Sequence, residues 1–265
     1  TAYHYGNEAV IGKVLKEYFS SGKLKREDVF ITTKLPYFAH APEDVPKVVE
    51  MQLEALQVDY IDLYLIHGPV PFKREKDKFE LAFENGMQVP DPIGHLDTWR
   101  AMEKLHDEGK LKALGLSNFN VKQVQNVYDH ARIKPANLQI ELHIYWPQTE
   151  LIQLCKILNI SITAYAPIGS PGRKGFNPKM NWPDGDPLTE PVVKELAKLT
   201  IPKTVKPQRV KENMDIFDFS LTDEEMKELF SVKTRVRLHT WEFAIGHPFY
   251  PFDDVQQTTP FCLKP

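Results

Sequence analysis

The sequence has little cysteine, no long apolar run and no excess of positive charge, and each absence excludes a class of protein. Its two cysteines, Cys155 and Cys262, belong to no CxxC pair and no cysteine–histidine cluster. They predict reduced thiols in a reducing compartment, with neither a disulfide framework nor a metal site. No apolar stretch reaches the roughly 18 residues of a membrane span. The net charge of −3 provides no basic surface for nucleic acid or an anionic membrane.

The remaining pattern is an alternation of short apolar strands and amphipathic helices. With 265 residues, of which 42% are hydrophobic, the chain is long enough for one large domain spanning 1–265. Alternation without hairpin signals predicts a parallel sheet in an α/β fold. Six strands, counting a fragment, are fewer than the eight of a closed barrel. We expect strands at 28–35, 59–66, 111–117, 135–142, 161–165 and 201–205, and helices at 42–56, 96–108, 121–131, 147–158 and 188–198.

Two loops and the C-terminal tail fall outside this alternation. Residues 68–95 and 170–187 hold much of the proline and glycine, and loops of this length are usually functional lids or disordered. The tail after Val232 is rich in aromatic residues and proline, which favour burial over a position in water. We interpret residues 232–265 as a flap packed on the active-site face. The alternative is that the tail plugs the other end of the barrel.

Three side chains carry the functional signal: Tyr5, Lys34 and His67. Lys34 directly follows the run 29–33, and His67 directly follows the run 60–66. Both runs indicate buried parallel strands. In a barrel of alternating strands and helices, the chemistry gathers at the C-terminal ends of the strands. A phenol, an amine and an imidazole that meet there suit proton delivery to a carbonyl. Taken singly, the three could instead be a core aromatic, a solvated strand end and a buried hydrogen-bonding group.

Seven motifs, in order along nearly the whole chain, make the resemblance to a family specific: TAYHYGNE, TTKL, LYLIHGP, LGLSNFN, QIELH, AYAPIGSP and IPKTVKPQR. Taken together they resemble the aldo-keto reductases. The resemblance implies a (β/α)8 TIM barrel that binds a nicotinamide cofactor without a Rossmann fold. Consistent with this, no GxGxxG follows any expected strand.

The resemblance also implies a role for each of the three side chains. Tyr5 matches the general acid, Lys34 the amine that lowers its pKa, and His67 the residue that orients the substrate carbonyl. A tyrosine with a pKa near ~10 holds its proton tightly, and a nearby ammonium stabilises the phenolate. The imidazole can donate to the carbonyl oxygen as negative charge develops there.

The cofactor NADP(H) is implied in the same way. One group of matching residues would bind the nicotinamide carboxamide and stack on its ring. A second group would cover the pyrophosphate, hold the 2′-phosphate and approach the adenine, and its two cations and hydroxyl favour NADP over NAD. The first group is Ser117, Asn118, Gln139 and Tyr165, and the second is Ser170, Lys203, Thr204, Arg209 and Asn213.

The chain departs from the family pattern at two places. The family's catalytic Asp would immediately precede Thr1, and its first two strands would come earlier still. A helix and the start of the last strand, about 20 residues, would lie between Thr200 and Ile201. We therefore expect these residues to be parts of a longer protein, discontinuous at that point, because a barrel without those strands leaves open sheet edges. The alternative is a truncated variant.

Substrate choice is expected to depend on Gly68, Pro36 and Trp241. Gly68 and Pro36 stand where many relatives carry pocket aromatics, so the wall beside His67 is open unless aromatic residues of the tail, such as Trp241, refill it. The prediction is a cytoplasmic, monomeric, NADPH-dependent reductase of aldehydes and ketones. Two alternatives stand beside it: a weakly active or inactive NADP-binding or structural protein of the same fold, and a barrel aldolase in which Lys34 forms a Schiff base.

Overall fold

A parallel sheet forms the centre of the computed structural model, which describes residues 1–176, 182–195 and 220–255. The strands follow the order β1-β2-β5-β6-β7, and the β1–β2, β2–β5 and β5–β6 pairs are parallel. This confirms the predicted α/β class. The strands are β1 (Thr32–Leu35), β2 (Ile61–Ile66), β5 (Leu111–Ser117), β6 (Asn137–Glu141) and β7 (Ser161–Tyr165).

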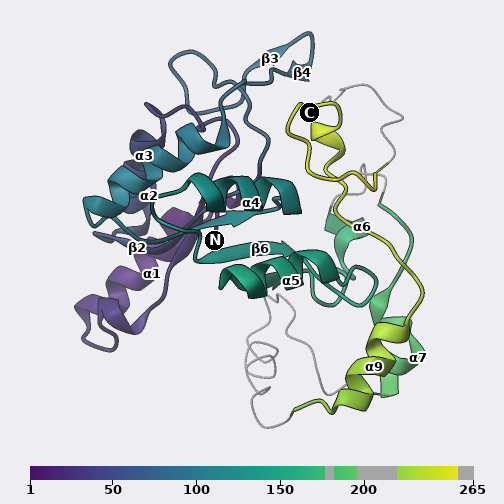
Figure 1. Cartoon of the computed structure of the whole chain (residues 1–265). Helices are drawn as coiled ribbons and strands as arrows, with labels where there is room; N and C mark the ends of the chain where they lie inside the picture. The colour runs from purple at the N-terminus through teal and green to yellow at the C-terminus, as the bar shows by residue number, and fades with distance from the viewer. Residues whose placement is uncertain (177–181, 196–219, 256–265) are drawn as a thin grey trace. The chain divides into compact units, whose positions relative to one another are not determined.

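Helices alternate with these strands, and α1, α2, α3 and α4 pack as successive neighbours (Figure 1). Asn120 is the N-cap of α4 and accepts a hydrogen bond from the Gln123 backbone N–H at 2.9 Å. The helices are α1 (Glu8–Ser20), α2 (Val45–Leu56), α3 (His95–Asp107), α4 (Val121–His130), α5 (Thr149–Leu158), α6 (Arg173–Phe176), α7 (Pro191–Glu195) and α9 (Asp223–Ser231). Short 3₁₀ turns occupy Tyr3–Tyr5, Arg26–Asp28, Pro187–Thr189 and Glu242–Ala244.

Two sequence expectations about local structure were wrong. The first strand begins at Thr32 rather than at residue 28, because Arg26–Asp28 forms a 3₁₀ turn and Phe30 is exposed. The helix expected at 188–198 is divided into a 3₁₀ turn (Pro187–Thr189) and α7 within the described residues. Pro191 begins α7, where its fixed φ and missing N–H suit the first helical position.

The loop 68–95 contains a hairpin that the sequence analysis excluded. Strands β3 (Phe83–Glu84) and β4 (Met87–Gln88) pair antiparallel around Asn85 and Gly86. Both turn residues have positive φ, 52° and 77°, which is the requirement of a type I′ turn. The Asn-Gly pair was therefore the hairpin signal. The expectation of an alternation without hairpins is wrong at this position.

The chain divides into two compact units. Of the described residues, the first unit holds 1–139, 153–162 and 241–255, and the second holds 140–152, 163–176, 182–195 and 220–240. In the first unit, the tail packs on the loop after β2, with His247 Nε2 2.7 Å from the Pro71 carbonyl oxygen. The cluster that joins them contains Val70, Phe72, Trp241, Ala244, Ile245, Tyr250 and Phe252.

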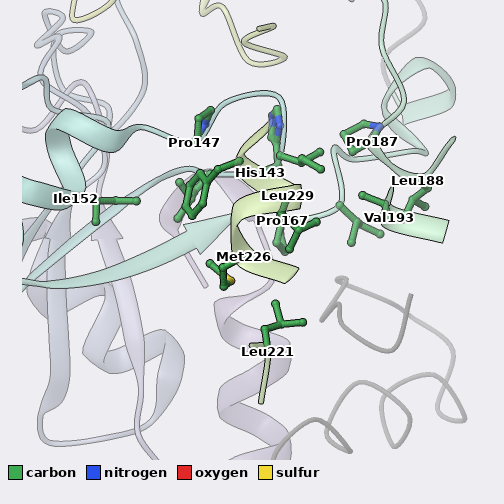
Figure 2. A pocket seen from close by; sticks show the side chains of 14 residues that line it. His143, Pro147, Ile152, Pro167, Pro187, Leu188, Val193, Leu221, Met226 and Leu229 are labelled. Carbon is green, nitrogen blue, oxygen red and sulfur yellow. The ribbon is translucent and has the colours of Figure 1, made fainter. Parts of the chain in front are cut away.

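The second unit surrounds an apolar cavity of about 480 Å³ (Figure 2). Side chains from α7 and α9, among them Val193, Met226 and Leu229, line it. Beside it, the buried Glu141 carboxylate accepts hydrogen bonds from the backbone N–H groups of Leu238 and His239, at 2.6 and 3.0 Å. None of the predicted catalytic residues lines this cavity. Within the described part of the chain, no helix has the length and apolar character of a membrane span.

Candidate active site

Lys34 lies near the end of β1 and is 4% exposed. Its Nζ donates a hydrogen bond to the Thr1 carbonyl oxygen at 2.8 Å. The same nitrogen lies 5.1 Å from the centre of the Tyr5 ring, within range of a cation–π contact. Tyr5 ends the 3₁₀ turn Tyr3–Tyr5 and is about half exposed. The amine and the phenol of the prediction are therefore neighbours.

His67 directly follows β2, and its backbone N–H donates to the Leu35 carbonyl oxygen at 3.3 Å. The edge of its ring meets the Tyr5 ring at a centroid distance of 5.9 Å and an interplanar angle of 85°. The Tyr37 ring stacks on the same imidazole, with the ring centroids 5.2 Å apart. The His67 Nδ1 atom is buried and has no hydrogen-bond partner among the described residues. Tyr5, Lys34 and His67 thus lie together in the first unit.

The electrostatics of these three groups are dominated by burial. Burial lowers the pKa of Lys34 to about 8, against the opposing charge of Glu8. Burial, with Lys34 and His4 adding to it, holds the pKa of His67 well below 6.5, so its imidazole is neutral at pH 7. Burial also raises the pKa of Tyr5. This direction is opposite to the one expected from a neighbouring ammonium, and its cause is desolvation of the phenolate.

Three of the residues assigned to the nicotinamide meet where the end of β5 pairs with the middle of β6. Ser117 pairs with Gln139 in the sheet register, and its Oγ donates to the Gln139 carbonyl oxygen at 2.9 Å. Asn118 has a positive φ of 63°, and its Nδ2 donates to the His67 carbonyl oxygen at 2.9 Å. Asn118 thereby connects this group to the catalytic candidates.

Two further cofactor candidates belong to the second unit. The Tyr165 ring, at the end of β7, meets the His239 ring edge-on at 5.4 Å. Ser170 Oγ lies 3.4 Å from His239 Nε2. The remaining candidates, Lys203, Thr204, Arg209 and Asn213, and the expected break between 200 and 201, lie outside the described residues.

The Trp241 side chain of the tail fills the space beside Gly68, the residue that follows His67. A Cβ added to Gly68 would lie 2.3 Å from Trp241 Cη2 and 3.0 Å from Tyr37 Cε1. Of the two outcomes expected from the sequence, an open wall or one filled by tail aromatics, the structure has the second. Pro36 directly precedes Tyr37 at the end of β1, where the chain leaves the sheet.

Sequence reasoning missed Tyr37 and His4. His4 stacks on Tyr37 at 5.0 Å and lies 5.9 Å from His67, so the two rings border the candidate site. Burial lowers the pKa of His4 to about 4. The available signal was position: Tyr37 follows the end of β1 by two residues, and His4 is the neighbour of Tyr5.

Polar side chains gathered where parallel strands end define the class of α/β barrel enzymes, and the comparisons identify the family. The model of the Aldo/keto reductase family matches residues 1–195. The chain is 40% identical to aldo-keto reductase family 1 member A1 of Gallus gallus over 281 residues, covering 94% of this chain and 84% of that protein. The Xenopus tropicalis protein of the same name is 38% identical over 289 residues, covering 96% and 85%.

A solved structure agrees with this. The aldose reductase of Schistosoma japonicum superposes with a TM-score of 0.84 at 42% identity, covering 96% of this chain and 85% of that one. The chain belongs to the aldo/keto reductase family and has its TIM-barrel fold class, of which the described residues provide a five-stranded sheet. The resemblance stated from the motifs is confirmed.

Proposed function

We propose that this chain reduces aldehydes and ketones to alcohols, with NADPH as the hydride donor. The observation that carries the proposal is the meeting of Tyr5, Lys34 and His67 at the ends of β1 and β2. The relatives' names, aldo-keto reductase and aldose reductase, support a small-molecule carbonyl substrate.

Each of the three residues has a distinct part in the reaction. A bound nicotinamide would supply the hydride that adds to the carbonyl carbon. Tyr5 donates its phenolic proton to the carbonyl oxygen, and the raised pKa means that the phenol is fully protonated beforehand. Lys34 stabilises the phenolate that remains. His67, neutral because it is buried, donates a hydrogen bond to the oxygen as negative charge develops there.

The residues proposed for the cofactor fit its chemistry. The Gln139 amide makes no side-chain hydrogen bond within the described part of the chain, so its donor and acceptor are available to a carboxamide. Ser117 and Asn118 would complete that contact, and Tyr165 would stack on the ring. The assignment of Ser170 to the pyrophosphate, and of Lys203, Thr204, Arg209 and Asn213 to the phosphate and adenosine end, rests on the family motifs.

The remaining expectations are part of the same proposal. Gly68, Pro36 and Trp241 would shape the substrate pocket, with residues 232–265 as the active-site loop of a single barrel domain spanning 1–265. We place the protein in the cytoplasm as a monomer. The two cysteines, which belong to no CxxC pair, support a reducing compartment.

Cofactor choice provides the test. NADPH and NADH oxidation should be measured with a panel of aldehydes and ring ketones, and binding of both cofactors by fluorescence titration. We expect turnover with NADPH, and Arg209→Ala should weaken NADPH binding by a few kcal/mol and NADH binding hardly at all. Tight NADPH binding with no turnover on any carbonyl would favour the non-catalytic alternative. Equal losses of both cofactors in Arg209→Ala would refute the 2′-phosphate assignment.

A further inference from the structure

A buried histidine joins the tail to the segment that follows His67. His247 is 3% exposed, and its Nε2 atom lies 2.7 Å from the Pro71 carbonyl oxygen. The other ring nitrogen, Nδ1, accepts a hydrogen bond from the Phe249 backbone N–H at 3.0 Å. Because a carbonyl oxygen only accepts and a backbone N–H only donates, the imidazole must carry its proton on Nε2. His247 is therefore a neutral imidazole that uses both nitrogens, one within the tail and one toward the loop after β2.

The acceptor of this bond lies in a segment that an ordinary sheet ladder cannot hold. Residues 68–72 are buried, and Pro69 and Pro71 have no backbone N–H to donate. Their buried carbonyl oxygens still need hydrogen-bond donors. Imidazoles supply two of these donors, since His95 Nε2 lies 2.8 Å from the Pro69 carbonyl oxygen and His247 serves Pro71. The Pro71 carbonyl is thus a point at which the tail is bound to the chain just after β2.

The same short segment meets the tail a second time, at Gly68. Two turn hydrogen bonds connect the two meeting points: the Ala244 N–H donates to the Trp241 carbonyl oxygen at 2.8 Å, and the His247 N–H donates to the Ala244 carbonyl oxygen at 3.0 Å. The Trp241 indole fills the space beside Gly68, where an added Cβ would lie 2.3 Å from Cη2. Fixing His247 on Pro71 therefore also fixes where the indole lies.

His67 is held independently of this contact. Its backbone N–H donates to the Leu35 carbonyl oxygen at 3.3 Å, and its carbonyl oxygen accepts from Asn118 Nδ2 at 2.9 Å. Its ring meets the Tyr5 ring at a centroid distance of 5.9 Å. Breaking the bond at Pro71 should therefore move the tail and leave the proton-delivery group in place.

We propose that His247 is a positioning residue that sets substrate size: through the Pro71 carbonyl it holds Trp241 against Gly68 and so excludes bulky carbonyl compounds. The inference rests on the proposed function, since selectivity requires turnover. A loosened tail frees the space that the indole fills, which a ring ketone needs and a small aldehyde does not. The change should lie in KM for ring ketones rather than in kcat, because it removes an obstacle to binding and leaves the reacting groups unchanged.

Two amide substitutions separate the two hydrogen bonds of His247. A glutamine places its NH₂ group near the position of Nε2, so His247→Gln can still donate to Pro71. An asparagine is one methylene shorter and places its oxygen near the position of Nδ1, so His247→Asn can keep only the contact with Phe249. The two measurements are the ratio of kcat/KM for a ring ketone to that for a small aldehyde, and hydrogen exchange of residues 241–255 in the whole chain.

In His247→Asn we expect the ratio to rise about tenfold, the lower end of the effect of one methylene in an apolar pocket, and exchange of the tail to become faster. In His247→Gln both quantities should stay within about twofold of the wild type. His247→Phe keeps an aromatic ring and loses both hydrogen bonds. It should behave as His247→Asn does, and it carries the test if His247→Asn does not fold.

Two further variants are controls. Trp241→Leu opens the wall directly, so adding His247→Asn to it should change the ratio by less than about twofold. Thr98→Val removes another buried hydrogen bond of the same unit, 2.8 Å long, which joins α3 to the His40 carbonyl oxygen rather than to the tail. Thr98→Val should lower stability in urea unfolding without changing the ratio or the exchange of the tail.

Three results would overturn the inference: an unmoved ratio in folded His247→Asn, equal rises in His247→Asn and His247→Gln, or an equal rise in Thr98→Val. A further tenfold rise on adding His247→Asn to Trp241→Leu would refute action through the indole. Failure of the proposed function is distinguishable, because it appears as a wild type that turns over no carbonyl compound, whereas turnover with an unmoved ratio refutes only the role of His247. Without turnover, the claim on substrate size fails too, and hydrogen exchange decides whether His247 holds the tail.

Discussion

Gly68→Ala tests whether residue 68 and the tail compete for one space. The new Cβ would lie 2.3 Å from Trp241 Cη2 and 2.5 Å from Cζ3, whereas carbon atoms in contact lie about 3.5–4.0 Å apart. The indole must therefore move by about 1 Å or more. It is 8% exposed and packs against Tyr37, Phe243 and Phe252 at centroid distances of 5.5–5.6 Å, so little free space receives it.

Overpacking of this kind costs about 1–3 kcal/mol of unfolding free energy. Trp241→Leu makes room, so Gly68→Ala should be nearly neutral in that background, with a coupling energy of about 1–3 kcal/mol. Urea unfolding followed by circular dichroism measures the four variants of this cycle. Gly172→Ala is the matched control, because nothing lies within 4 Å of its added Cβ.

Limited proteolysis checks where the strain is released. Gly68→Ala should speed cleavage within 241–255, and the double variant with Trp241→Leu should not be cleaved faster than Trp241→Leu alone. Additive free energies, within about 0.5 kcal/mol, would show that the two positions do not compete and would refute the account of the wall beside His67.

Two other predictions concern the fold. Gly12→Ala should lower the unfolding free energy by about 1–3 kcal/mol, because its Cβ would lie 2.1 Å from the Ala55 carbonyl oxygen where α1 crosses α2. Urea unfolding measures this loss, with Gly172→Ala as the control. A loss no greater than that of Gly172→Ala would contradict the close approach. Burial, with His95 and His247 adding to it, lowers the pKa of His40 to about 3, so the unfolded chain binds the extra proton below pH 6.5. Stability from this group is therefore complete above pH 6.5 and is lost as the pH falls toward 3, by about 1.4 kcal/mol per pH unit. His40→Leu should flatten the pH dependence of the unfolding free energy between pH 6.5 and 4 by up to that slope, and an unchanged slope would contradict it.

The sequence predicted the parts of the fold that depend on local pattern. The strand Leu111–Ser117 lies where its apolar run placed it, because a buried parallel strand is a short continuous apolar segment. The strand Ser161–Tyr165 also has the predicted bounds, although none of its residues is buried. Helix α9 was missed although its signal was present: Thr222 and Glu225 form a capping box. The sequence analysis also predicted no helix at Glu8–Ser20, where α1 lies.

Contacts between distant segments could not be predicted from local pattern. The meeting of Trp241 with Gly68 depends on the path of the tail, and no spacing rule gives that path. The raised pKa of Tyr5 depends on how far the phenol is desolvated, which the neighbouring Lys34 alone does not determine. The grouping of Tyr5, Lys34 and His67 was predictable because two of them end or follow adjacent parallel strands.

The central claim is that Tyr5 delivers the proton during carbonyl reduction. Steady-state NADPH oxidation with an aromatic aldehyde, measured with the wild type and Tyr5→Phe, tests it most directly when NADPH affinity is measured on the same samples. We expect Tyr5→Phe to lower kcat by about 10²–10⁴-fold and to leave the NADPH Kd within about twofold, because the phenol acts in the transition state. Turnover in Tyr5→Phe comparable to that of the wild type would contradict the account.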